Sequence, residues 1–446
     1  MFSFLIALLI AASFFLIPSD YAPIFIAALI VLIPVVFYWI KKPIYALYTV
    51  VFVSLLPHGL IPQDIYDYLY KLLAIVATVT WLFDILRRRG KILVTPTTLF
   101  IFFFMLWSLV TLFWTNNVSI GITFLQIYLA RFVIFLLLVP NLIRSDNHLD
   151  GFMTVLALSA WTLVLSSVIT VLSTGYLPGM RFKVFEENEN ALGILTLVSM
   201  SGVVWKALQP SKLKVKIWKP LAFLFLLAAI GIIAMSGSRG SLISLFVTFV
   251  VFLFWKQTRV FGKVGILYLI MIGLLTPILF KATFERFTLA DPTNTLLGGR
   301  EALWSAAWMY IKNNPWIGAG IGNSNYVMLS YLQYFRSILG LNYAPVHNPV
   351  LTIWMETGLP GLILFLTGLI SAAVFFIKQY IKNKSLDYDF LRPYFPIIGS
   401  VFCGYMLSWI KGGGIESSIS YFLILALLLI PSSFIPSSLS NQPSIR

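Results

Sequence analysis

The chain has 446 residues, of which 59% are hydrophobic and only 11% are charged, and its mean hydropathy is +0.92. This composition excludes a soluble globular domain and indicates a polytopic membrane protein. The formal net charge of +15 does not indicate a nucleic-acid-binding protein, because the basic residues are spread over short loops between apolar segments. The single cysteine, Cys403, excludes an internal disulfide and a cysteine-rich metal site.

The apolar segments are long and unbroken, which is typical of membrane helices, and they lack the weak alternation of an outer-membrane barrel. At about 20 residues per span, they predict an all-α bundle of about 12 to 14 transmembrane helices. The first segment has no basic residue before it and no convincing cleavage site after it, so we expect a retained span. The predicted spans cover residues 2–17, 21–40, 43–61, 66–86, 97–114, 121–140, 152–174, 191–208, 218–235, 241–255, 264–280, 350–377, 394–410 and 418–436.

Lys and Arg are divided unevenly among the loops between these spans. Loops 206–219 and 256–263 are rich in them, whereas 181–190, 237–240 and 281–349 are poor for their length. The positive-inside rule therefore predicts cytoplasmic N and C termini and places the poorer loops outside. Segment 281–349 is also the longest polar interruption of the chain. Because long ordered loops usually carry function, we expect this loop to roof an active site.

Arg239 lies in the sequence SGSRG, between two predicted spans and at their outer ends. Gly237 and Gly240 permit a tight turn there. An interfacial arginine that anchors a helix end is the alternative explanation. The positive-inside rule disfavours an arginine on the outside, and the turn contains no acid of its own, so we favour phosphate binding slightly.

Arg300 begins a helix predicted from GGREALWSAAWMYIKNN. An arginine at a helix N-terminus opposes the helix dipole, and a bound anion would relieve this; an ion pair with Asp291 or Glu301 is an equally good explanation. The glycine-rich stretch 318–323 is one residue short of a dinucleotide fingerprint and follows no strand, so we exclude that function. One apolar stripe, which predicts that the helix lies along the membrane surface, comprises Leu303, Trp304, Ala307, Trp308 and Ile311.

His347 and Asn348 are the last polar residues before the next predicted span, and no other histidine occurs in the long loop. An imidazole that titrates near neutral pH suits the removal of a proton from a hydroxyl group. A lone histidine is more often structural, and two arginines predicted on the same side of the membrane favour catalysis here. Glu356 would face away from His347 on a continuous helix, so we expect it to brace the break at 358–361.

The outer loop 181–190 mixes basic, acidic and amide side chains, with Arg181 near its start and Asn190 at its end. Such a loop suits sugar binding, although a solvated loop explains its glutamates as well. No pair of carboxylates has a glycosidase context and no histidine cluster has metal-ligand spacing, so we expect neither a metal nor a cofactor. For Lys71 and Arg131, inside predicted spans, we expect packing against an acid or a carbonyl.

Three motifs in order, SGSRG, GGREALWSAAWMYIKNNPWIGAGIGN and HNPVLTIWMETGLPGLILFL, resemble the O-antigen ligase and O-antigen polymerase superfamily of bacterial membrane glycosyltransferases. The resemblance is strongest from about Asn188 to Leu366. It implies an N-terminal transmembrane bundle (1–180), an O-antigen ligase-like core with its extracytoplasmic loop (181–377, loop 281–349), and C-terminal helices with a tail (378–446).

The resemblance also implies a chemistry: metal-independent transfer of a glycan from undecaprenyl diphosphate to a hydroxyl acceptor, at the outer face of the bacterial inner membrane. Arg239 and Arg300 fall where the family has diphosphate-binding arginines, and His347 falls where it has the histidine that activates the acceptor. The expected partners are a lipid-linked glycan, a glycan or lipid A core acceptor, and membrane lipid.

Within the superfamily we favour a polymerase that joins lipid-linked repeat units of a surface polysaccharide, and the alternative is a ligase that attaches a finished glycan to lipid A core. A third hypothesis, from another class, is a small-solute or inorganic-carbon transporter. A transporter would need functional charges near the bilayer midplane, where Arg131 and Glu356 are the main candidates.

Overall fold

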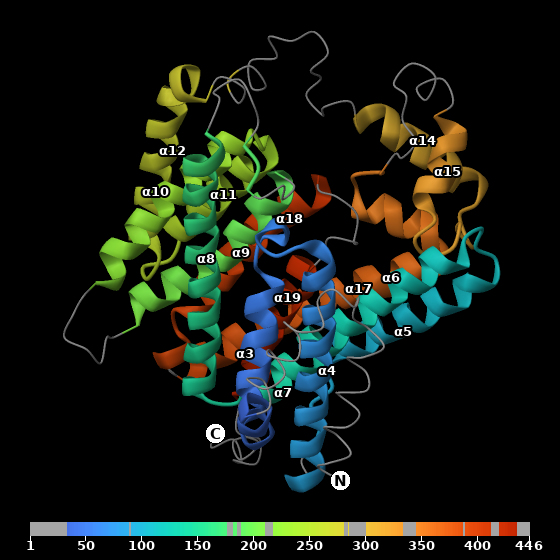
Figure 1. Cartoon of the computed structure of the whole chain (residues 1–446), viewed down its shortest axis with the longest axis horizontal. Coiled ribbons are helices and arrows are strands. Elements are labelled where there is room, and N and C mark those ends of the chain that lie inside the picture. Colours follow the sequence, from blue (N-terminus) through green and yellow to red (C-terminus); the bar gives the residue numbers. More distant parts are fainter. Residues whose placement is uncertain are drawn as a thin grey trace.

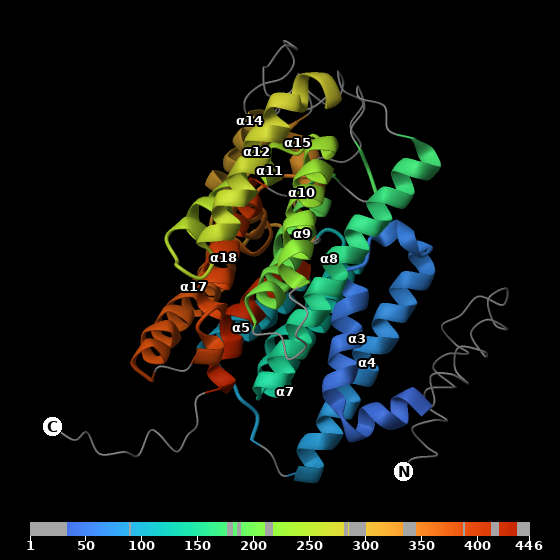
Figure 2. The same ribbon diagram turned by 90° about the vertical axis from the view of Figure 1, so that its left-hand side faces the viewer.

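The computed structural model describes residues 34–88, 91–175, 182–184, 189–209, 217–280, 284, 300–332, 345–386, 389–411 and 419–434. Every regular element in these ranges is a helix, and the helices run together in a bundle with loops at its two ends (Figures 1 and 2). The predicted all-α membrane fold is confirmed. The predicted span 2–17 and most of 21–40 lie outside the described residues.

The helices of the bundle coincide with the apolar segments of the sequence. Within the described ranges, nine are long and apolar enough to cross a membrane, and two shorter apolar helices, α11 and α19, accompany them. The helices are α3 (Pro43–Ser54), α4 (Gln63–Arg88), α5 (Pro96–Val110), α6 (Val118–Arg131), α7 (Val139–Leu142), α8 (Asp146–Thr174), α9 (Glu189–Leu208), α10 (Trp218–Ser236), α11 (Arg239–Leu253), α12 (Arg259–Leu279), α14 (Arg300–Asn313), α15 (Ser324–Tyr331), α17 (Pro349–Leu386), α18 (Tyr394–Lys411) and α19 (Ile419–Leu429).

A sharp bend precedes α3, where the sequence predicts two separate spans. The helix Pro34–Lys41 and α3 are bent by 118° relative to each other. Pro43 has no amide hydrogen to continue the helical ladder, so the chain turns at Lys42. Because α3 has 12 residues, it is about 18 Å long, which is short of a bilayer core. The pair has the length and apolarity of a span only when it is taken together.

Small residues bring the central helices close together. A Cβ on Gly202 of α9 would lie 2.4 Å from the Met153 carbonyl oxygen of α8, and one on Gly404 of α18 would lie 2.5 Å from the Ser244 carbonyl oxygen of α11. The Ser244 hydroxyl also donates to the Ser408 hydroxyl of α18 at 2.8 Å. Close backbone approach and interhelical hydrogen bonds are the usual means of joining helices in lipid. They hold α11, which begins at Arg239, firmly against α18.

The centre of the bundle is filled by α19, all of whose residues are buried. The Tyr421 ring stacks on the Phe365 ring of α17 at 4.9 Å between centroids and on the Trp409 ring of α18 at 5.8 Å. This aromatic stack joins the last three helices around one axis. An 11-residue helix can therefore be stable here because protein, and not lipid, surrounds it.

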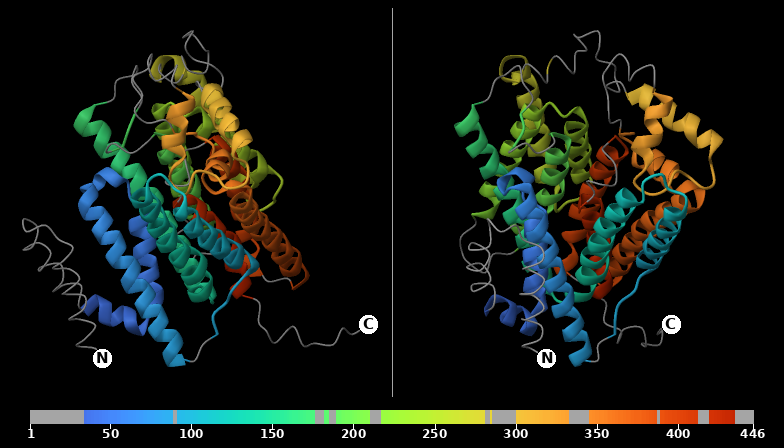
Figure 3. Two further views of the ribbon diagram at one scale, coloured as in Figure 1. Left: turned by 90° about the vertical axis from the view of Figure 1, so that its right-hand side faces the viewer. Right: turned by 45° about the vertical axis from the view of Figure 1, so that its right-hand side comes forward.

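Helices α14 and α15 lie at one end of the bundle, above the start of α17 (Figures 1 and 3). They form a second small core, in which Ala307 and Ile311 of α14 pack with Met328 of α15 and Met355 of α17. The predicted apolar stripe of α14 is thus buried in part against neighbouring helices. Its residues Ala307 and Ile311 pack with α15 and α17, whereas Trp308 of the same stripe is 43% exposed.

Candidate active site

Arg239 is the first residue of α11, at a turn of two residues after α10. Gly237 has φ 65°, a left-handed conformation that a residue with a Cβ adopts at a cost. Next to Arg239, the Ser238 hydroxyl donates to Asn190 Oδ1 at 2.9 Å and lies 2.9 Å from the Ser241 hydroxyl. Ser238 directly precedes Arg239 and is hydrogen-bonded to Asn190, so the two predicted site residues Asn190 and Arg239 lie at the same turn.

The chain that follows Arg181 reaches the same turn. The Phe182 amide donates to the Met235 carbonyl in the last turn of α10, at 3.0 Å. Arg181 itself lies outside the described residues. On the other side of the turn, a Cβ on Gly193 would lie 2.1 Å from the Ser241 Oγ, so α9 packs closely against the start of α11. The segment that follows Arg181 and the first turn of α9 therefore both lie beside the turn that precedes α11.

Arg300 begins α14, as the sequence predicts. Trp304 lies four residues later, on the same face of the helix. Its indole nitrogen donates to the Val346 carbonyl at 3.1 Å. Because Val346 immediately precedes His347, this hydrogen bond holds the histidine beside the face of α14 that carries Arg300. Sequence reasoning identified both ends of this arrangement but assigned Trp304 only to the apolar stripe.

His347 has a left-handed backbone, with φ 53°, and no other non-glycine residue in the described ranges has a positive φ. Such conformations are uncommon and often occur at functional sites. The next residue, Asn348, caps α17: its Oδ1 accepts from the amides of Val350 and Leu351 at 3.0 and 3.2 Å. The histidine is therefore fixed from both sides, by Trp304 through Val346 and by the cap of α17.

The environment of His347 favours its neutral form. Burial lowers the pKa of the imidazole from 6.5, and the positive charge of Arg300 lowers this pKa further. At neutral pH the ring is therefore uncharged and has a nitrogen lone pair that can accept a proton. Together with the hydrogen bond from Trp304 to Val346, this effect of Arg300 on His347 is consistent with one site for the predicted pair.

The loop between α14 and α15 is hydrogen-bonded to a break in α17. At Gly358 the backbone has φ 66° and ψ −175°, so the helix bends and its carbonyl groups are released. The amides of Ala319 and Gly320 donate to the freed carbonyls of Met355 and Glu356, at 2.7 and 2.8 Å. In return, the Leu359 amide donates to the Pro315 carbonyl at 2.9 Å. The glycine-rich stretch 318–323 is thus structural. We call these backbone hydrogen bonds between residues 315–320 and 355–359 the clamp.

Glu356 strengthens this clamp, as expected for a buried acid at the break. Its Oε1 accepts from the Ser324 hydroxyl at 2.7 Å and from the Ser324 amide at 3.4 Å, at the start of α15. The clamp also reaches the end of α5 and the start of α6, because the Thr111 hydroxyl accepts from the Ile321 amide at 3.0 Å and Asn323 Oδ1 accepts from the Asn117 amide at 3.1 Å. Both α14 and His347 are therefore anchored to the membrane bundle.

The candidate site has two parts, which lie at the same end of the bundle (Figure 1). One part contains Arg239 of α11 and Asn190 of α9, two helices that pack with each other and with α10 and α18. The other contains Arg300 and His347, on α14 and at the start of α17. The right-hand view in Figure 3 shows the α10–α12 group and the α14–α15 pair on two sides of the upper end of α18.

Part of the chain matches a known protein family. Residues 223–366 match the O-antigen ligase family model, and this range contains Arg239, Arg300 and His347. The chain is 24% identical over 332 residues to the teichuronic acid biosynthesis protein TuaE of Bacillus subtilis, and 28% identical over 175 residues to an uncharacterized protein of Haemophilus influenzae.

The two alignments cover 66% and 35% of this chain. They cover 64% and 43% of the relatives, so the chain spans less than two thirds of the length of either relative. The family match and the described membrane helices together confirm the resemblance seen in the three sequence motifs. Residues 223–366 of this multi-pass membrane protein are thus similar to the O-antigen ligase family, and the chain shares its wider similarity with a teichuronic acid biosynthesis protein.

Proposed function

We propose that the protein is a glycosyltransferase that moves a glycan from undecaprenyl diphosphate to a hydroxyl acceptor without a metal ion or cofactor. The observation that carries the proposal is the pairing of Arg300 with a neutral, fixed His347 inside the O-antigen ligase region. The proposed core, residues 181–377, extends the matched region to include Asn190 and the segment after it.

In this mechanism His347 accepts the proton of the acceptor hydroxyl as its oxygen attacks the anomeric carbon. General base catalysis of this kind typically contributes 10²- to 10⁴-fold in rate. A neutral imidazole is required, and burial together with Arg300 favours that form. Arg300 thus has a double role, because its charge also stabilises an anion in front of the α14 N-terminus.

Arg239 and Arg300 bind the leaving diphosphate, which gains negative charge as the glycosidic bond breaks. A guanidinium group can donate two parallel hydrogen bonds to a phosphate, and each charge-assisted bond contributes about 1.5–3 kcal/mol. Two arginines can therefore supply the charge stabilisation that a metal ion supplies in other enzymes. Asn190 and Arg181, at the ends of the neighbouring outer loop, contact the sugars.

For the acceptor, we infer the end of a second lipid-linked repeat unit, which makes the protein a polymerase of surface polysaccharide. TuaE, by its name a teichuronic acid biosynthesis protein, favours polysaccharide synthesis over attachment to lipid A core. The site faces the outside of the bacterial inner membrane and both termini lie in the cytoplasm, since the basic loops cluster at the opposite ends of the spans.

The test is glycan transfer in proteoliposomes that contain undecaprenyl diphosphate-linked repeat units, with EDTA present. We expect the wild-type protein to lengthen chains. Arg239→Ala, Arg300→Ala and His347→Ala should each reduce the initial rate at least about 100-fold, because each removes charge stabilisation or the base. Lys312→Ala is the matched control: this basic residue lies in the last turn of α14, and its loss should leave the rate within about twofold.

Other outcomes are equally informative. Transfer only after lipid A core is supplied would make the protein a ligase. Loss of activity in EDTA would overturn the metal-independent mechanism. If the folded protein transfers glycan to neither acceptor but carries solute, with flux dependent on Arg131 and not on His347, the transporter hypothesis would replace the enzyme.

A further inference from the structure

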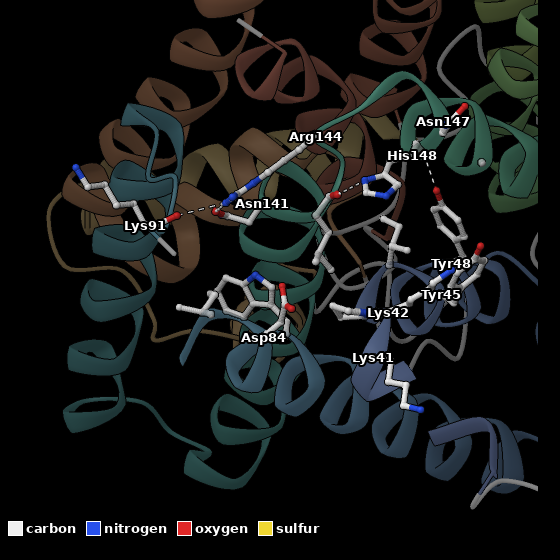
Figure 4. Close-up of a pocket in the computed structure, with 16 residues that line it drawn as sticks. Lys41, Lys42, Tyr45, Tyr48, Asp84, Lys91, Asn141, Arg144, Asn147 and His148 are labelled. Carbon is white, nitrogen blue, oxygen red and sulfur yellow. Dashed lines mark hydrogen bonds between the residues drawn. The ribbon is translucent and has the colours of Figure 1, made fainter. Parts of the chain in front are cut away.

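A second polar site lies at the end of the bundle opposite to α14 and α15. It is a cavity of about 660 Å³ bounded by the start of α3, the last turns of α4, and the segment that joins α7 to α8 (Figure 4). Of the residues proposed for glycan transfer, those that the structure describes do not line it. Its side chains are strongly basic: Lys41, Lys42, Lys91 and Arg144 line it together with one acid, Asp84.

Arg144 is held in place at the wall of this cavity. Its Nη2 donates to Asn141 Oδ1 at 3.0 Å and to the Lys91 carbonyl at 3.3 Å. Asn141 is in turn fixed, because its Oδ1 accepts from the Leu93 amide at 2.7 Å. Both bonds of the Arg144 side chain to described residues use Nη2, so Nε and Nη1 can donate to a ligand. A positioned guanidinium is well suited to a phosphate group.

The opposite wall is also preorganised. The Tyr48 hydroxyl of α3 donates to the His148 carbonyl in the first turn of α8, at 2.6 Å. Gly151 permits this contact, since a Cβ there would lie 2.4 Å from the Tyr48 hydroxyl. Lys42 lines the cavity and is exposed, and its ammonium group lies 5.8 Å from the centre of the Tyr38 ring. The Tyr48 hydrogen bond thus joins α3 to α8 beside the cavity.

An apolar surface runs from this cavity along α4. Trp81 and Ile85 line the cavity, and Leu82 and Leu86 follow them on the adjoining face of the helix. The side chains of Leu82 and Leu86 are 43% and 77% exposed. A ligand with a phosphate group and acyl chains would satisfy both surfaces. We propose that this cavity binds the phosphate-bearing headgroup of an anionic phospholipid, whose acyl chains lie along α4.

The proposal is tested by thermal unfolding of the purified full-length protein in detergent, titrated with phosphatidylglycerol, phosphatidylcholine or inorganic phosphate. Phosphatidylglycerol should raise the Tm of the wild-type protein, because a ligand that binds only the folded state stabilises it. In the double variant Lys42→Gln and Arg144→Gln, the apparent affinity for phosphatidylglycerol should fall about thirtyfold. Lys42→Gln alone, which changes one exposed side chain, should reduce it about fivefold and keeps the test decisive if the double variant is unstable.

The matched control is the double variant Lys256→Gln and Lys263→Gln. It removes two exposed charges near the start of α12, outside the cavity, and should bind phosphatidylglycerol as the wild-type protein does. An equal loss in both double variants, or an equal response to phosphatidylcholine, would overturn the proposal in favour of diffuse surface attraction. A response to inorganic phosphate that abolishes any further effect of phosphatidylglycerol would overturn the lipid as the ligand.

Discussion

At the scale of single residues, the proposed chemistry depends on the protonation state of His347. Burial is the main cause of its low pKa and the charge of Arg300 adds to it. A base must be unprotonated, so transfer should be fully active above the lowered pKa and should decline as the pH falls through it. The acid limb of the pH–rate profile therefore lies below 6.5, the usual value for histidine.

We predict that Arg300→Gln raises the pKa of His347. The substitution removes the positive charge that disfavours protonation, and the effect of burial remains. The pKa can be measured without activity, from the pH dependence of diethylpyrocarbonate modification at His347, followed by peptide mass spectrometry. Lys312→Gln, on the same helix, is the control and should leave the profile in place. An unchanged profile in Arg300→Gln would separate the two residues and contradict the shared site.

The sequence indicated the chemical groups of this site but not their contacts. Arg239, Arg300 and His347 stand out because charged side chains are rare in an apolar chain. The hydrogen bonds from Trp304 to Val346 and from Ser238 to Asn190 join residues 42 and 48 positions apart, and no local pattern indicates such pairs. Trp304 could have been found from its spacing to Arg300; Ser238 carried no signal beyond its place in SGSRG.

At the scale of elements, α17 is the helix that connects the site to the membrane. It begins with the cap beside His347, breaks at Gly358, and continues through the bundle beside α5. The GLPG sequence predicts a break, because proline removes an amide donor and glycine permits unusual dihedral angles. It does not predict that the freed carbonyl groups bind the loop between α14 and α15, since those partners are distant in the chain.

We predict that Gly358→Ala disrupts this clamp. The φ of 66° with ψ −175° is a region almost restricted to glycine, and the new Cβ would lie 2.0 Å from the Trp316 carbonyl oxygen. Backbone strain and steric overlap together should lower the free energy of unfolding by about 3 kcal/mol or more. Glycan transfer should fall at least about tenfold, because α14 and His347 lose their anchor.

The control for this substitution is Gly273→Ala on α12, where a Cβ meets no atom within 4 Å. It should leave the unfolding temperature and transfer nearly unchanged. Both quantities can be measured on the same purified protein, by fluorescence-detected thermal unfolding and by chain elongation. A wild-type Tm and rate in Gly358→Ala would show that the break in α17 does not support the site.

At the scale of the whole molecule, hydropathy was sufficient to locate the spans, because a bilayer imposes length and apolarity on each helix. Every predicted span from residue 43 onward overlaps a described helix, but α3 and α19 are shorter than the spans predicted there. The exceptions have physical reasons. The helix α3 is short because Pro43 bends the chain by 118° from the preceding helix, and α19 is short because it lies inside the bundle.

The distribution of basic residues predicts which end of the bundle faces the cytoplasm. The first turns of α10 and α12, which follow basic stretches of the sequence, lie toward one end, whereas the start of α11 and α14 lie toward the other (Figure 2). The proposed enzyme needs its site outside, where lipid-linked glycans are joined, and the proposed phospholipid cavity then faces the cytoplasmic leaflet. Both proposals therefore depend on one orientation, which can be measured directly.

We predict that a membrane-impermeant maleimide added to intact spheroplasts labels a cysteine on α14 but not one between α11 and α12. The chain allows a simple design, because Cys403→Ser removes its single cysteine. In that background, Lys312→Cys should react from outside, and Lys256→Cys should react only after the membrane is permeabilised, since both native lysines are exposed. Lys91→Cys, at the rim of the phospholipid cavity, should behave like Lys256→Cys. The reverse pattern would invert the molecule and place His347 in the cytoplasm, where acceptor activation in the proposed reaction has no substrate.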